Sequence, residues 1–146
     1  MTLQSRYLPN NTPCFIANMS NNQSISTATW TVLHIDNVVY DSHNGFDTDN
    51  YKYIVQEEGI YLITGVGWMG EYLAMGDAMY IVVNVNASNV AQSYWYIYSA
   101  GYPSLNASCF YSLVPDDYIL MKGYHNYGSD RAFGGTYTQL MAFRIA

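Results

Sequence analysis

The chain has 146 residues, of which 50% are hydrophobic and 11% are charged, and its net charge is −6 at pH 7. This length suits one domain with a substantial core, and the apolar content excludes a disordered chain. The 5 Lys and Arg residues are scattered, whereas a nucleic-acid interface needs a basic stripe, so no nucleic-acid partner is expected. No run approaches the ~18 apolar residues of a membrane helix, and we expect no membrane insertion.

Tyrosine is unusually frequent, with 16 copies. Together with abundant Asn and Ser it favours a surface that contacts protein or sugar. The alternative is that tyrosine rings fill a core and leave their hydroxyls at its edge. Composition leaves both interpretations open.

The N-terminal segment and the cysteines indicate the compartment. Residues 1–13 lack the apolar stretch of a secretory signal, so we expect synthesis in the cytoplasm. In a reducing compartment Cys14 and Cys109 are expected to be thiols rather than a disulfide.

No segment keeps a helical period, whereas strand patterns recur between Gly, Asn, Asp and Pro residues. Turn residues at spacings of roughly 8–12 predict an all-β, antiparallel sandwich or jelly roll. The expected strands are residues 14–19, 27–35, 51–55, 60–68, 78–86, 93–99, 108–114, 118–124 and 136–145.

Two of these expected strands are apolar on both faces. Along residues 78–85 large apolar side chains occupy both alternating sets, with Val82 on one face and Val83 on the other. Residues 136–145 behave similarly. One face packs in the core, and the other is expected to meet a second sheet or a neighbouring subunit.

Six short motifs carry a family resemblance. They are Cys-Phe-Ile-Ala at 14–17, His-Ile-Asp-Asn-Val at 34–38, Gly-Phe at 45–46, Gly-Ile-Tyr-Leu at 59–62, Asp-Asp-Tyr-Ile-Leu-Met at 116–121 and Phe-Gly-Gly at 133–135. In this order and spacing they resemble the C1q/TNF-like superfamily over nearly the whole chain. The sequence departs from the family pattern at Asp116, where a Gly is usual, and in a longer final strand.

The resemblance implies a C1q/TNF-like jelly-roll domain over residues 13–146 that forms a homotrimer. A heterologous contact that closes after three copies makes a ring instead of a filament. The resemblance implies neither a cofactor nor an enzymatic activity. A signal peptide and a collagen stalk, common in animal members, are not found in the sequence, so the chain is more similar to free-standing versions on bacteriophage virions.

That comparison predicts a trimeric structural protein on the virion surface, made in the host cytoplasm. Because no shaft-forming segment is found, a capsid decoration (cement) protein is favoured over a conventional fibre head. Residues 1–12 would be an arm that docks through Leu3, Arg6, Tyr7 and Leu8 onto the major capsid protein or another virion protein. The alternatives are a head of a tail fibre that binds a host receptor or glycan, and a secreted C1q-like ligand.

Aromatic and polar side chains suited to a glycan or receptor gather in two regions of the sequence. Sugar sites combine Trp or Tyr rings with hydrogen-bonding side chains. Strand tyrosines at alternating positions instead favour packing in a core or an interface, as in Tyr94, Tyr96 and Tyr98. The candidate ligand-binding residues are Trp95, Tyr102, Tyr124, His125, Asn126 and Tyr127.

Catalytic and metal-binding motifs are not found. The histidines His34, His43 and His125 lack the short spacing of metal ligands. Asp47 and Asp49 begin like a calcium loop, but the Gly and the terminal Glu of that motif are missing. Turn aspartates that bond their own backbone are the favoured interpretation. We expect no enzyme, no metal and no cofactor.

Overall fold

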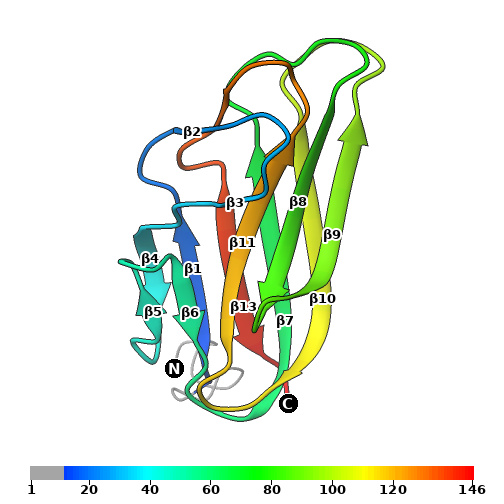
Figure 1. Ribbon diagram of the computed structural model, residues 1–146. Helices are drawn as coiled ribbons and strands as arrows, with labels where there is room; N and C mark the ends of the chain where they lie inside the picture. Colours follow the sequence, from blue (N-terminus) through cyan, green and yellow to red (C-terminus); the bar gives the residue numbers. More distant parts are fainter. Residues whose placement is uncertain (1–11) are drawn as a thin grey trace, which may run out of the picture.

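The computed structural model describes residues 12–146, which form strands and no helix (Figure 1). Within the same range no helix could cross a membrane. The strands are β1 Cys14–Asn18, β2 Gln23–Ile25, β3 Thr31–Val32, β4 Asn37–Asp41, β5 Phe46–Asp47, β6 Lys52–Ile54, β7 Gly59–Trp68, β8 Ala78–Val85, β9 Ser88–Tyr96, β10 Ser104–Leu113, β11 Tyr118–His125, β12 Arg131–Phe133 and β13 Gln139–Arg144.

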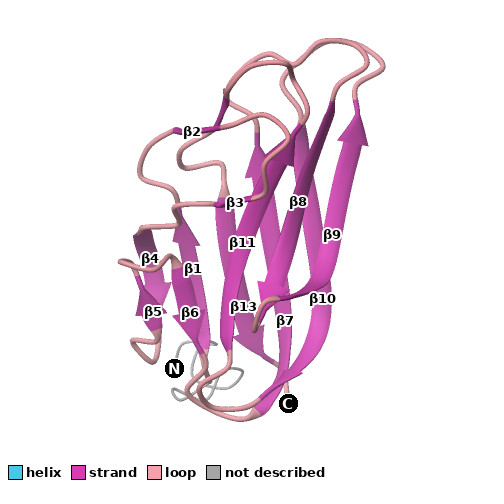
Figure 2. Cartoon of the chain, in the orientation of Figure 1, coloured by secondary structure: helices cyan, strands magenta, loops and turns pink. Residues whose placement is uncertain are grey.

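Two antiparallel sheets pack face to face as a sandwich (Figure 2). One has 5 strands in the order β10-β7-β13-β1-β4, and the other has 6 strands that include β5-β6-β11-β8-β9 with β3 paired to β11. The short strands β12 and β2 pair separately. Because neighbouring strands are mostly distant in sequence, the chain crosses repeatedly between the sheets. The predicted all-β, antiparallel jelly roll is confirmed.

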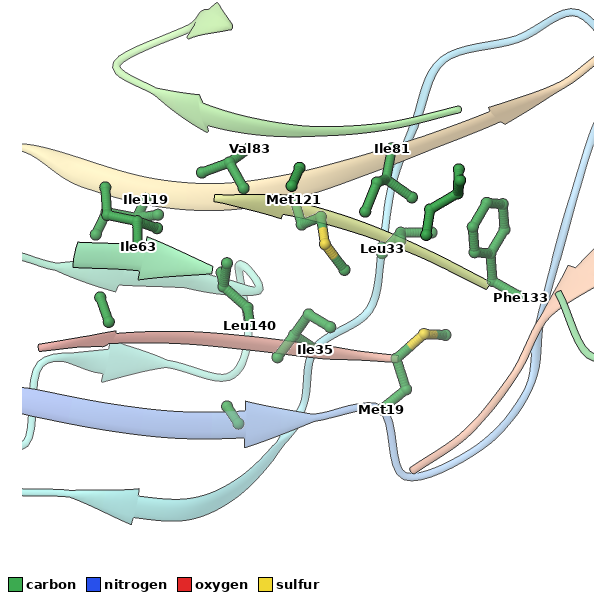
Figure 3. Packing of buried hydrophobic residues seen from close by; sticks show 14 of the residues in the cluster. Met19, Leu33, Ile35, Ile63, Ile81, Val83, Ile119, Met121, Phe133 and Leu140 are labelled. Atoms are coloured by element: carbon green, nitrogen blue, oxygen red, sulfur yellow. The ribbon is translucent and has the colours of Figure 1, made fainter. Parts of the chain in front are cut away.

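The core lies between the sheets and follows the two-residue period of the strands. Along β7 and β11, buried side chains alternate with partly exposed ones. Figure 3 shows Ile63 and Leu140 of the five-stranded sheet near Val83, Ile119 and Met121 of the six-stranded sheet. Each fully buried aliphatic side chain of this kind contributes about 1.5–3 kcal/mol.

Glycines in β7 allow the two sheets to approach closely. A Cβ atom added at Gly65 would lie 2.7 Å from Met121 Sδ, and one at Gly67 would collide with Ile81. Pairing of β7 with β10 continues residue by residue through both glycines. A larger residue at either position would therefore force the sheets apart.

The segment 27–35 corrects the sequence prediction. Only Thr31–Val32 pairs as a strand there. Leu33 and Ile35 are fully buried, and the Leu33 N–H donates to the Met121 carbonyl at 2.9 Å. The β-branched and aliphatic residues of this segment are thus buried under the end of a sheet and do not form a long strand. Conversely, residues 37–41, which were not among the expected strands, form the edge strand β4.

Candidate functional site

The outer face of the five-stranded sheet carries a row of apolar residues. The register places Phe110, Leu62, Phe143 and Cys14 side by side across β10, β7, β13 and β1. The exposed fraction is 66% for Phe110 and 44% for Phe143. Rings of this size are expensive to leave in water, so the row is a candidate contact surface.

A second row lies directly beside the first. Met141 of β13 is opposite Ile16 of β1, which is opposite Tyr40 of β4. Ile16 is 40% exposed and Tyr40 is 53% exposed. The second row continues on β7 and β10 as the polar pair Thr64 and Ser108. We call the apolar members of the two rows the apolar face; they are Cys14, Ile16, Tyr40, Leu62, Phe110, Met141 and Phe143.

Beyond the second row the same sheet becomes more polar. The next register level holds Asn106, Val66, Gln139, Asn18 and Asn37. Within this polar row the Asn37 side-chain amide donates to Asn18 Oδ1 at 2.8 Å. Amide side chains that bond one another need no partner molecule, so the polar row limits the apolar face on this side.

A depression of about 470 Å³ begins at the polar row and extends to the end of the sheet where β7 finishes. Its lining residues are Val66, Trp68, Ser104, Tyr137 and Gln139. The rings of Trp68 and Tyr137 have centroids 5.2 Å apart and an interplanar angle of 68°. The lining therefore combines an aromatic corner with uncharged polar groups.

The outer face of the six-stranded sheet carries a different aromatic feature. The register aligns Tyr124 of β11, Tyr80 of β8 and Tyr94 of β9, and Trp30 joins this row from the segment before β3. Ring centroids are 5.1 Å apart for Trp30–Tyr124, 5.5 Å for Tyr80–Tyr124 and 5.4 Å for Tyr80–Tyr94. We call these four residues the aromatic stripe; its neighbouring rings pack on one another, and the two end members, Trp30 and Tyr94, are 44% and 63% exposed.

Comparison with known proteins identifies the architecture. Neither a protein-family model nor a curated protein matches the chain. Solved structures do match: the globular domain of zebrafish complement 1qA protein has a TM-score of 0.69 at 9% identity, covering 92% of this chain and 98% of that one. Murine APRIL at pH 8.0 has a TM-score of 0.68 at 15% identity, covering 92% and 100%. The fold is the C1q/TNF-like jelly roll.

A third similar structure, Eiger TNF from S. frugiperda, has a TM-score of 0.67 at 15% identity and covers 92% of both chains. At such low identity the likeness establishes the jelly roll and nothing finer. The C1q/TNF resemblance in the sequence is thereby confirmed as a fold, and the bacteriophage type stays a prediction.

The jelly roll separates the four successive residues proposed for one ligand loop. Tyr124 belongs to the aromatic stripe, whereas His125 is fully buried with Nε2 3.1 Å from a backbone carbonyl of β2. Asn126 Oδ1 accepts the first backbone N–H of β8 at 2.6 Å. The guanidinium of Arg131 lies 3.5 Å from the ring centre of Tyr127. These side chains have separate structural contacts and do not converge on one site.

The predicted residue Tyr102 lies at a rigid aromatic tip. The connections 69–77 and 97–103 are joined by reciprocal backbone hydrogen bonds between Leu73 and Gly101, at 2.9 and 3.1 Å. They form the end of the jelly roll opposite the C-terminus (top in Figure 1). The exposed large side chains on these two connections, here called the aromatic tip, are Tyr72, Met75, Tyr98 and Tyr102.

Trp95, the remaining candidate, lies on β9 on the opposite side of the strand from Tyr94 and Tyr96. It is 49% exposed. Tyr94, Tyr96 and Tyr98 are also exposed, at 63%, 45% and 78%. These tyrosines therefore do not pack in the core of the chain, and packing in an interface with another molecule stays a prediction. The proposed arm residues Leu3, Arg6, Tyr7 and Leu8 lie outside the described residues.

A Ser-His-Glu contact occurs near the end of β4 but serves the backbone. Ser42 Oγ lies 2.7 Å from His43 Nδ1, and His43 Nε2 lies 3.3 Å from Glu57 Oε1. The Ser42 oxygen also accepts the Cys14 N–H at 2.9 Å and contacts the Thr12 carbonyl at 3.1 Å. A hydroxyl with these bonds holds the start of β1 in place and is not a free nucleophile.

The candidate calcium-like loop bonds itself. Asp47 accepts the Asn50 side-chain amide at 2.8 Å and the Asp49 N–H at 3.1 Å. These hydrogen bonds, the one from Asn50 first, lower the pKa of the Asp47 carboxyl. Across residues 12–146 no group of three or more His, Cys, Asp or Glu residues is placed to hold a metal ion. Cys14 and Cys109 are unbridged, as expected.

Proposed function

We propose that this jelly roll is a non-enzymatic structural protein that assembles as a homotrimer through its apolar face. The observation that carries the proposal is the continuity of exposed Ile16, Tyr40, Phe110 and Phe143 across neighbouring strands of one sheet. A standard protein interface buries about 800 Å² per partner and is enriched in aromatic side chains at its centre. The apolar face has the composition that such an interface requires.

Three copies are proposed because the C1q/TNF resemblance implies a ring. In a heterologous contact the apolar face of one subunit meets a different surface of the next. Exposed aromatic side chains on the adjoining β9–β10 side of the sandwich, such as Trp95 and Tyr111, offer that second surface. Closure after three such contacts leaves no apolar face open to form a filament.

Within this assembly we assign the protein to a virion surface as a capsid decoration protein of a bacteriophage. The support comes from the sequence: the similarity to free-standing phage versions, and the polar arm of residues 1–12. The arm would dock on the major capsid protein or another virion protein. The secreted C1q-like ligand remains the reading to adopt if no virion association is found.

A head that binds a host receptor or glycan is the second candidate, and the aromatic tip favours it. Tyr98 is 78% exposed and Met75 is 74% exposed, although the backbone beneath them is firmly hydrogen-bonded. Exposed aromatic side chains on a rigid frame lose little entropy on binding.

Absolute mass from light scattering behind a sizing column tests the assembly. Three chains per particle support the proposal, and a clean monomer at micromolar concentration rejects it. Co-sedimentation with purified capsids then tests the role, with a variant lacking residues 1–12 as the matched comparison. The truncated protein should keep its trimeric mass and lose capsid association. Retained capsid binding would reject the arm, and adhesion to host cells without capsid binding would favour the second candidate.

A further inference from the structure

We propose that the depression lined by Trp68 and Tyr137 binds a neutral saccharide. This proposal goes beyond the structural role, and it concerns neither the aromatic tip nor the residues predicted from sequence. Its volume of about 470 Å³ lies within the roughly 300–1,000 Å³ range of small-molecule sites.

The Trp68 indole is held in place before any ligand arrives. Gly134 lies against the ring so closely that an added Cβ would collide with it. The backbone beneath the ring is fixed by hydrogen bonds: the Gly134 N–H donates to the Trp68 carbonyl at 2.8 Å, and the backbone N–H of Trp68 donates to Thr138 Oγ1 at 3.2 Å. Thr138 is itself fully buried. A ring fixed in this way binds a ligand without a further cost in side-chain entropy.

Tyr137 turns this fixed ring into a corner. Its ring meets the indole at 68°, and the side chain is 67% exposed. A pyranose ring has apolar C–H faces and a polar rim of hydroxyl groups. The C–H face suits an aromatic surface, whereas the hydroxyls need hydrogen-bonding partners at the edge.

Ser104 and Gln139 supply those partners without charge. The Ser104 hydroxyl is both donor and acceptor. The Gln139 amide nitrogen already donates to the Thr136 carbonyl at 2.9 Å, which leaves its Oε1 to accept a sugar hydroxyl. None of the five lining residues is charged, and the chain carries a net charge of −6. This lining favours a neutral saccharide over an anionic one.

The depression is compatible with an assembled protein. The polar row forms the near edge of the depression through Val66 and Gln139, and in the register of the sheet it lies between the aromatic corner and the apolar face. Burial of the apolar face by another subunit therefore does not require the depression to be covered.

The test uses the full-length protein on an array of neutral oligosaccharides, each printed beside its sialylated or sulfated derivative. The best neutral compound is then titrated by calorimetry. Tyr137→Ala and Trp68→Phe should each weaken its binding about tenfold, because each removes part of the aromatic corner. Tyr98→Ala, which removes a similarly exposed ring from the aromatic tip, should leave the affinity unchanged.

Five results would overturn the proposal: no neutral oligosaccharide bound at millimolar concentration, preference for the charged derivatives, affinity unaffected by Tyr137→Ala, equal loss in Tyr98→Ala, or a lowered particle mass of Tyr137→Ala. Because Tyr137 is mostly exposed, its variant should fold even if Trp68→Phe does not. Light scattering on Tyr137→Ala separates this proposal from the assembly. Lost saccharide binding with unchanged mass supports the depression as a ligand site, whereas lowered mass would place it in a subunit contact and overturn it.

Discussion

The two outer faces of the sandwich are both rich in apolar side chains, yet they are covered differently. On the six-stranded sheet Val82 points outward but is only 1% exposed, between Lys122 and Gln92 on the neighbouring strands. On the five-stranded sheet Phe110 points outward and is 66% exposed. The centre of the first face is covered by its own chain, and its exposed rings, Trp30 and Tyr94, lie at the two ends of the aromatic stripe. On the second face, the exposed members of the apolar face lie on four of the five strands.

The difference shows that apolar content on a strand face does not by itself indicate a subunit contact. The aromatic stripe covers its sheet because tyrosines in register stack across strands and Trp30 packs beside them. The apolar face has rows in register as well, but its exposed side chains Ile16, Tyr40, Phe110 and Phe143 lie on four different strands instead of only at the ends of a stacked row.

The first prediction introduces a charge on each face. Phe143→Asp should convert the trimer to monomers, because an unpaired carboxylate at the centre of an apolar contact costs several kcal/mol. Tyr94→Asp, on the aromatic stripe, should keep the trimeric mass. Light scattering on both variants measures the effect. If Phe143→Asp stays trimeric, the apolar face is not the subunit contact. If Tyr94→Asp is monomeric, the subunit contact involves the six-stranded sheet.

The second prediction uses Cys14, which belongs to the apolar face, as a chemical reporter. Alkylation of its thiol should be on the order of tenfold slower in the wild type than in Phe143→Asp, since assembly covers it. Burial raises the pKa of the Cys109 thiol, which should react slowly in both proteins and serve as the internal reference. Mass spectrometry of the labelled peptides gives both rates. Equal Cys14 rates would contradict coverage of this row.

The third prediction separates folding from assembly within the monomeric Phe143→Asp background. Trp30→Ala should lower the free energy of unfolding by about 2 kcal/mol, because it removes a half-buried ring from the aromatic stripe. Phe110→Ala should change it by less than about 0.5 kcal/mol, because this ring is mostly in water. Urea unfolding measures both values. A large loss in Phe110→Ala would mean that the apolar face contributes to the fold.

The smallest effect concerns two buried tyrosine hydroxyls. Tyr61 donates to the Glu57 carbonyl at 2.7 Å, whereas the buried Tyr53 hydroxyl has no hydrogen-bond partner. Tyr61→Phe should lower the free energy of unfolding by about 1 kcal/mol, and Tyr53→Phe should raise it by a similar amount. Urea unfolding at neutral pH checks both signs, and a loss in Tyr53→Phe would reveal an unseen partner such as water.

The same pair gives the protein an alkaline limit. Burial raises the pKa of both phenols, so both stay protonated in the folded protein at pH values where the unfolded chain ionises. Stability should therefore fall as pH rises above the unfolded value of about 10. The double Phe variant should lose less stability between pH 9 and about 11 than the wild type. Equal losses would show that other groups govern the alkaline limit.

Much of the fold was predictable because it depends on local alternation. The buried positions along residues 60–68 and 118–124 have a two-residue period that a half-buried sheet requires. The strand predicted over residues 27–35 was wrong because a buried irregular segment and a strand can have the same β-branched, apolar composition. Only the positions of Leu33 and Ile35 under the sheet end decide between the two.

The candidate sites were less predictable because they depend on cross-strand neighbours. The sequence places Tyr124 and His125 together, but strand alternation sends one outward and the other into the interior. Trp68, Ser104 and Gln139 are far apart in sequence and meet only through the pairing of β7 with β10 and β13. The place of Trp30 and Tyr94 in the aromatic stripe likewise depends on the register between strands and could not be predicted from the sequence. The glycine against the Trp68 ring was visible in sequence as Phe-Gly-Gly, but its role required the structure.

The pairing of β1 with β13 places both ends of the jelly roll at one end of the sandwich. Cys14 is opposite Phe143, so the beginning and end of the jelly roll emerge at the same end of the sandwich. The aromatic tip and the depression lie at the other end, about 30 Å away along the ten residues of β7. A tether at the C-terminus would therefore leave the opposite end of the sandwich pointing outward. A protein fused after Ala146 should leave the aromatic tip and the depression exposed.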